Sequence, residues 1–346
     1  MQRTETCNDF DAQKFVDNLL ENGSKIGCNT SLCEKCDLPP FYDDQVFKKG
    51  QQFFYKHIFA MFFAKFNGLL AILAAPSVLK ILMFTGKSST DFTAYIRYVS
   101  TVFHMIIWYE EEFKPGSRVW KSLRQVNSKH NSASRQSCRS SFNKITQMDM
   151  ALTQFGFMGF QVARPNLIGI HNATDEEFKA FIHFWKVVGY LMGIEDRFNI
   201  CRDSVKESRE ICNILINQIF HPQIVKKDEK FLKMARHLIR GMWSMHPILS
   251  FKTMMNYLHF LVKPSHCSLT NNNDVNIDKN EYFQLNFANN IRLIIINYSI
   301  RVLLKYHIFR IIFNWLEHLC LWFMKVFPIL AYYSFGTKNS LVKINV

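Results

Sequence analysis

The apolar segments of this chain are repeatedly interrupted by basic residues, and this limits how it can fold. The region from 51 to 84 is strongly apolar, but Lys56, Lys65 and Lys80 divide it, and its longest uncharged stretch is 66–79. A membrane-spanning helix needs about 20 consecutive, predominantly apolar residues. The region therefore favours buried core helices, or helices lying at an interface, over a clean span.

The C-terminal region repeats this pattern. Residues 290–346 contain seven basic residues and one acidic residue, Glu317, among runs of Ile, Leu and Phe. A basic amphipathic helix lying in a bilayer interface fits this pattern. A helix that packs on the domain core, with Arg and Lys stems reaching water, fits it equally well. Both interpretations stay open at the level of sequence.

Charge and aromatic content together point to a membrane surface as partner. The formal net charge is +14, 48% of the residues are hydrophobic, and Phe occurs 33 times. Such hydrophobicity excludes a mainly disordered chain. The sequence has no RNP pattern, zinc-finger pairing or long Lys/Arg block, so we expect no nucleic-acid binding. Nine cysteines and the absence of a secretory signal indicate reduced thiols and a cytosol-facing chain.

Apolar residues recur at three- and four-residue spacing, and strand-like alternation is nearly absent, so we expect one large all-α domain. Thr174 and Glu177 form a predicted capping box, and Asp149 is a suitable first-turn acid. Asp149 and Gln154, five residues apart, should not share a tight helical face. Gly86 is a predicted C-cap. The predicted helices cover approximately 91–113, 120–135, 146–162, 174–192, 203–219 and 228–243.

Four segments of the middle of the chain resemble a known family. They are 95–101 (YIRYVST), 120–123 (WKSL) with His130, 149–160 (DMALTQFGFMGF) and 183–199 (HFWKVVGYLMGIEDRFN). In order and spacing they resemble the family of the ER-bound oxygenase of mycophenolic acid biosynthesis and the rubber oxygenases (latex clearing proteins), most closely its arthropod branch. The resemblance covers approximately residues 40–260.

The resemblance implies a globin-like helical core holding haem b, and oxygen-dependent cleavage of a double bond in an isoprenoid chain. It also implies a membrane-associated protein of the endoplasmic reticulum. The chain would then comprise a polar leader (1–45), an oxygenase-like catalytic domain (46–263), a polar linker (264–289) and apolar basic C-terminal helices (290–346).

Two histidines are candidate metal ligands. His130 lies where this family carries a His or Lys facing the haem, although a histidine on a polar helix is often a surface or capping group. His183 opens the HFW segment on an apolar face, where a histidine is usually a core residue with one satisfied hydrogen bond. Rubber oxygenases carry their proximal histidine in the helix matching 146–160, which contains none here. Another histidine such as His183 would serve, or haem would bind differently or not at all.

Four further candidate site residues follow from the resemblance. Glu111 falls approximately at the catalytic glutamate of the rubber oxygenases, although a solvated acid patch is the alternative. Asn127 replaces an expected arginine, which removes a permanent charge from the site. Gly156 and Gly159 would, by their lack of a side chain, let a flat cofactor or a neighbouring helix approach the backbone closely, and helix packing is the commoner use.

Two functions are therefore predicted. The first is a haem-dependent oxygenase that cleaves or oxidises a hydrophobic isoprenoid or lipid substrate at a membrane. The alternative is a catalytically degenerate relative that binds lipid, or serves as a membrane-surface scaffold with the same fold.

Overall fold

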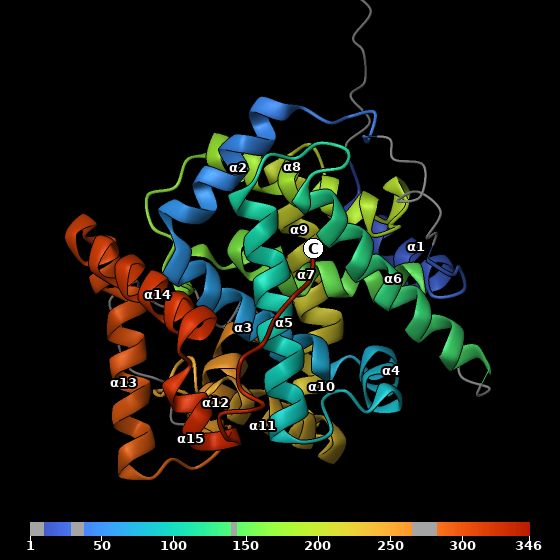
Figure 1. The fold of residues 1–346 in the computed structure, drawn as a ribbon. Helices are drawn as coiled ribbons and strands as arrows, with labels where there is room; N and C mark the ends of the chain where they lie inside the picture. The colour runs from blue at the N-terminus through green and yellow to red at the C-terminus, as the bar shows by residue number, and fades with distance from the viewer. Residues whose placement is uncertain (1–9, 29–37, 140–143, 265–281) are drawn as a thin grey trace, which may run out of the picture.

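The chain folds into a single all-α domain, which confirms the predicted fold class. The structure, a computed structural model, describes residues 10–28, 38–139, 144–264 and 282–346. Within these ranges there is no β-strand, only an isolated antiparallel bridge between Gly27 and Thr146. Parts of the predicted leader and linker lie outside the described residues. Figure 1 shows the arrangement of the helices.

The helices are α1 (Ala12–Asn18), α2 (Asp44–Lys56), α3 (Ile58–Ala74), α4 (Pro76–Thr85), α5 (Asp91–Glu110), α6 (Arg118–Arg139), α7 (Gln147–Ala163), α8 (Asp175–Leu191), α9 (Val205–Leu215), α10 (His221–Val225), α11 (Glu229–Met242), α12 (Phe251–Val262), α13 (Phe287–Arg301), α14 (His307–Val326) and α15 (Ile329–Phe335). The predicted helix over 203–219 is α9 followed by a π-helical turn at Ile216–Phe220.

Several helices begin where the sequence predicts. Thr174 and Glu177 form the expected capping box at the start of α8, and Thr146 forms another with Asp149 at the start of α7. In each box the threonine hydroxyl and the carboxylate satisfy backbone N–H groups that a helix start leaves unpaired. Gly86 ends α4 with φ of 64°, the left-handed conformation expected of a glycine C-cap.

Helix α3 forms the centre of the domain, and it meets α7 at a crossing of two glycines. A Cβ atom at Gly68 would lie 2.0 Å from the carbonyl oxygen of Gly156, and a Cβ at Gly156 would lie 1.9 Å from Cδ1 of Ile72. The two backbones therefore approach more closely than any side chain would permit. This contact fixes α7, and with it one wall of the site described below.

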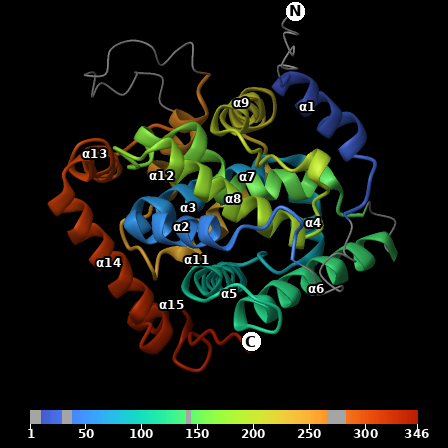
Figure 2. The ribbon, with the colours of Figure 1, turned by 90° about the horizontal axis from the view of Figure 1, so that it is seen from above.

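The C-terminal helices lie along one edge of the domain, where Figures 1 and 2 both place α13 and α14. Helix α14 buries Glu317, Leu321 and Met324 against the core. The last residues return to the core, where the Tyr95 hydroxyl donates a hydrogen bond to the carbonyl oxygen of Ser340.

Among the described residues, no individual helix combines the length and apolar character needed to cross a bilayer. Two bent pairs meet these criteria only when joined: α2 with α3, at an angle of 92°, and α14 with α15, at 51°.

Candidate functional site

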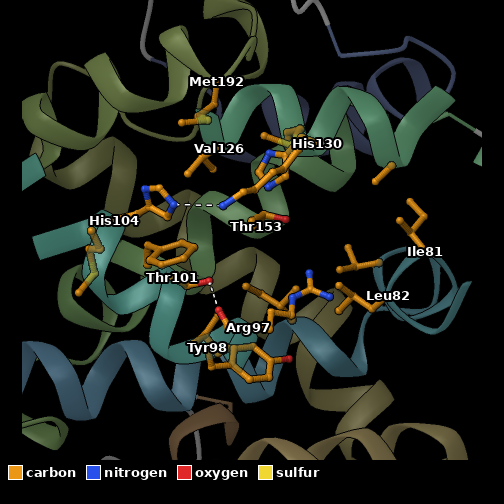
Figure 3. Close-up of a pocket in the computed structure, with 18 of the residues that line it drawn as sticks. Ile81, Leu82, Arg97, Tyr98, Thr101, His104, Val126, His130, Thr153 and Met192 are labelled. Atoms are coloured by element: carbon orange, nitrogen blue, oxygen red, sulfur yellow. Dashed lines mark hydrogen bonds between the residues drawn. The ribbon is translucent and has the colours of Figure 1, made fainter. Parts of the chain in front are cut away.

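A cavity of about 570 Å³ lies between α3, α4, α5, α6, α7 and α8. Its volume falls within the range of about 300–1,000 Å³ that is typical of small-molecule and cofactor sites. Most of the wall is apolar and includes Ile81 and Leu82 from α4 and Val126 from α6 (Figure 3). A few polar side chains interrupt this wall, and they determine what the cavity can bind.

His130 lies on the cavity wall, on α6, and its Nδ1 has no hydrogen-bond partner in the described part of the chain. Burial, reinforced by the positive charges of Arg97 and Lys129, lowers the pKa of His130 to about 4. The imidazole is therefore neutral near pH 7, which is the form that ligates metals. Of the predicted site residues, His130 alone lines this cavity.

A second histidine on the wall belongs to a hydrogen-bonded chain. Lys129 Nζ lies 3.2 Å from Nε2 of His104, and Nδ1 of His104 lies 2.8 Å from the hydroxyl oxygen of Ser122. Ser122 also accepts a hydrogen bond of 2.8 Å from the Trp108 indole. Burial and the neighbouring Lys129 lower the pKa of His104 to about 4. Because the ammonium can only donate, Nε2 of His104 is the acceptor and Nδ1 carries the proton.

Two polar residues of α7 line the same cavity, and each has one side-chain oxygen without a hydrogen-bond partner among the described residues. Asp149 uses Oδ2 in the capping box, while its Oδ1 has no partner. Gln154 donates to the carbonyl oxygen of Trp185 at 2.8 Å, and its Oε1 is likewise unpartnered. Both residues line the cavity despite their five-residue spacing, because the cavity runs along more than one turn of α7. Buried polar atoms without partners are costly unless a ligand or water satisfies them.

The predicted catalytic residues lie elsewhere. Glu111 follows the end of α5, where its Oε1 lies 2.9 Å from Arg118 at the partly exposed surface. Asn127 is buried on α6, but its amide donates to the carbonyl oxygen of Leu191 at 3.2 Å and accepts from Asn131. Neither side chain contributes to the cavity wall.

His183 is also outside the cavity wall. Its Nε2 accepts a hydrogen bond of 3.2 Å from the backbone N–H of Asp43, and its ring lies near those of Phe41 and Tyr42. Burial lowers the pKa of His183. The structure therefore separates His183 from His130: His183 lies on α8 and packs against the start of α2.

The two predicted glycines serve close packing. Gly156 faces Gly68 and Ile72 at the crossing of α3 and α7, and a Cβ at Gly159 would lie 2.3 Å from the ring of Phe155. The wall of the cavity is formed by other residues of α7, including Thr153 and Phe157.

Sequence reasoning missed the polar residues of α5 and the lysine of α6. Arg97, Thr101 and His104 recur at four- and three-residue spacing within an otherwise apolar helix, and all three line the cavity. A polar stripe of this kind in a buried helix was the signal that could have identified them.

We compared the chain with protein-family models, with curated proteins and with solved structures, and none of the three comparisons gave a match.

Proposed function

We propose that this protein binds haem b in the cavity beside His130 and acts as an oxygenase on a hydrophobic isoprenoid or lipid substrate. The observation that carries the proposal is a neutral, half-buried histidine whose Nδ1 has no partner among the described residues, on the wall of an apolar cavity of about 570 Å³. Haem-binding sites combine such a pocket with an axial ligand, usually histidine.

The residues on the wall fit this cofactor. His130 would hold the haem iron, and Arg97 would pair with a haem carboxylate, since charge-assisted hydrogen bonds to carboxylates are strong. The apolar side chains would cover the flat ring and exclude water. Haem supplies oxygen activation when bound, and the polarity of the surrounding pocket directs it.

The chain's own residues supply the polar part of the site. The ammonium group of Lys129, held by Nε2 of His104, would stabilise negative charge that develops on a substrate in the cavity. Asp149 lines the cavity, and its carboxylate oxygen without a partner among the described residues would accept a proton from a substrate there.

Spectroscopy of the full chain tests the proposal. Reconstitution with hemin should give a Soret band that shifts or weakens in His130→Ala. His183→Ala is the matched control, because that histidine is half-buried outside the cavity, and it should leave the band unchanged. A wild-type protein that takes up no hemin would overturn the haem assignment.

The alternative is a degenerate relative that binds lipid without catalysis. It is favoured by Glu111, which is ion-paired to Arg118 at the surface and does not face the cavity. A chain that binds lipids but no hemin would support this alternative. Haem-dependent turnover of a polyprenyl substrate, lost in His130→Ala, would exclude it.

We also propose that α13 and α14 dock on an anionic membrane. This docking would agree with the expected association with the endoplasmic reticulum membrane. Trp315, Trp322 and Ile308 are 62%, 52% and 60% exposed on the outer face of α14. Lys305 and Arg310 lie close to this apolar face in the sequence. Helices that combine an apolar face with basic residues lie in the interface of a bilayer. Failure of the full chain to float with anionic vesicles would overturn this part of the proposal.

A further inference from the structure

A second, smaller chamber lies between the domain core and the C-terminal helices. Its volume is about 90 Å³, which leaves room for about three water-sized groups. Phenylalanines of α3 form one side, and Met242 and Met245 at the end of α11 form another. Helices α13 and α14 close it with Ile296 and Glu317.

The two cavities share a wall. Five residues line both of them, so a partition of single side chains separates the small chamber from the cavity of His130: Leu69, Tyr98, Thr101, Met105 and Phe157. Met105 is unbranched and adaptable, so a rotamer change there could open a passage without moving a helix.

Glu317 is the polar end of the small chamber. It is 1% exposed, and neither carboxylate oxygen has a hydrogen-bond partner among the described residues. His246 also lines the chamber, and its Nε2 lies 3.4 Å from Oε1 of Glu317. The imidazolium of His246 balances the charge of Glu317, but lone pairs of the carboxylate oxygens stay without a hydrogen bond. A buried acceptor left without a partner costs free energy, so a ligand that donates a hydrogen bond to it would bind more tightly.

The amine of Lys65, which also lines the chamber, does not donate a hydrogen bond to Glu317. Nζ of Lys65 lies 5.1 Å from the ring centre of Phe54 and 5.5 Å from that of Trp185, so it is directed into an aromatic cluster. Because His246 already neutralises Glu317, a further cation in the chamber would be disfavoured. A neutral hydroxyl donor fits the carboxylate better.

We propose that the two cavities form one binding tract for a long apolar chain that ends in a hydroxyl group. The hydroxyl donates to Glu317 in the small chamber, and the chain passes Met105 into the cavity of His130. This inference rests on the proposed function, which places a hydrophobic substrate in the cavity of His130, and it adds the recognition of one end of that substrate.

The test compares 1-decanol with decyl methyl ether, which lacks the donor, by isothermal titration calorimetry of the full chain. We expect the alcohol to bind about tenfold more tightly, since hydrogen bonds to charged groups are the stronger ones. Glu317→Gln should reduce this preference to less than about threefold, with the affinity for the ether unchanged.

Met105→Trp provides a second variant that leaves the Glu317–His246 pair intact. It should fill the passage and remove the preference for the alcohol, while the chain still binds in the larger cavity. Ile81→Leu, on the far wall of that cavity, is the control and should keep the preference.

The outcomes separate the two proposals. If wild-type protein binds the alcohol and the ether equally, the hydroxyl-reading tract is wrong and the apolar cavity stands. If it binds neither, the apolar-ligand function itself fails. An unchanged preference in both Glu317→Gln and Met105→Trp would also overturn the tract.

Discussion

Nε2 of His246 lies 3.4 Å from Oε1 of Glu317, and this buried ion pair joins the end of the α11 region to α14. Burial opposes the charged imidazole, but the carboxylate of Glu317, with Cys320, outweighs it and raises the pKa of His246 to about 10. The only acidic residue of the segment 290–346 thus helps to anchor the C-terminal helices to the core.

This pair predicts a loss of stability in alkali. A histidine with a raised folded-state pKa stabilises the fold fully below its unfolded pKa of about 6.5, and this contribution disappears as pH rises towards 10. We expect the free energy of unfolding to fall by a few kcal/mol over this range. Denaturant titrations at pH 7 and pH 9.5 measure it. In His246→Gln the fall should be much smaller, and an equal fall in both proteins would contradict the prediction.

The neutral His130 predicts the opposite behaviour in acid. Its pKa is about 4 in the folded chain, so the unfolded chain takes up the proton first as pH drops below about 6.5. Stability should therefore be lost between pH 6.5 and 4, with His130 accounting for about 2 kcal/mol of the difference between pH 7 and pH 5. Urea unfolding of wild type and His130→Gln at the two pH values checks this. The variant should lose less stability, and an identical loss would argue against a buried neutral imidazole.

The glycine crossing predicts a large effect from one methyl group. Gly68→Ala would place Cβ 2.0 Å from the carbonyl oxygen of Gly156, and we expect a loss of about 3 kcal/mol because α3 and α7 must separate. Gly86→Ala is the control, since its Cβ would meet nothing within 4 Å and only the left-handed φ is strained, at about 1 kcal/mol. Thermal unfolding of both variants compares the two costs. Equal effects would show that the crossing tolerates a wider separation.

The outer face of α14 predicts membrane binding. Replacing Trp315 and Trp322 together by Ala removes two exposed indoles, and we expect at least about tenfold weaker binding to vesicles containing phosphatidylserine. Val225→Ala, at an exposed apolar side chain on α10, is the control and should bind as wild type does. Co-sedimentation with the vesicles at low and high salt separates the electrostatic contribution to binding, which salt weakens, from the apolar contribution. Unchanged binding by the tryptophan variant would place the membrane contact elsewhere.

Local signals in the sequence determined the helices. Three- and four-residue periodicity gave the all-α class, and the pairs Thr174–Glu177 and Thr146–Asp149 fix the starts of α8 and α7, because a capping box involves residues only three positions apart. The apolar and basic character of the C-terminal helices was also visible in the sequence. Which of those apolar side chains are exposed on α14 depends on which face of the helix points away from the core.

Tertiary structure decided the composition of the site. Lys129 contacts His104, which is 25 residues away in the sequence. Glu317 on α14 contacts His246, which follows α11. Tertiary structure also separated His183 and Glu111 from His130, because the partner of His183 at the start of α2 and the partner of Glu111 at the start of α6 both lie outside the cavity. A cavity is bounded by side chains from helices distant in sequence, so its membership depends on how α3, α5, α6 and α7 pack, which is a long-range property that periodicity and caps do not encode.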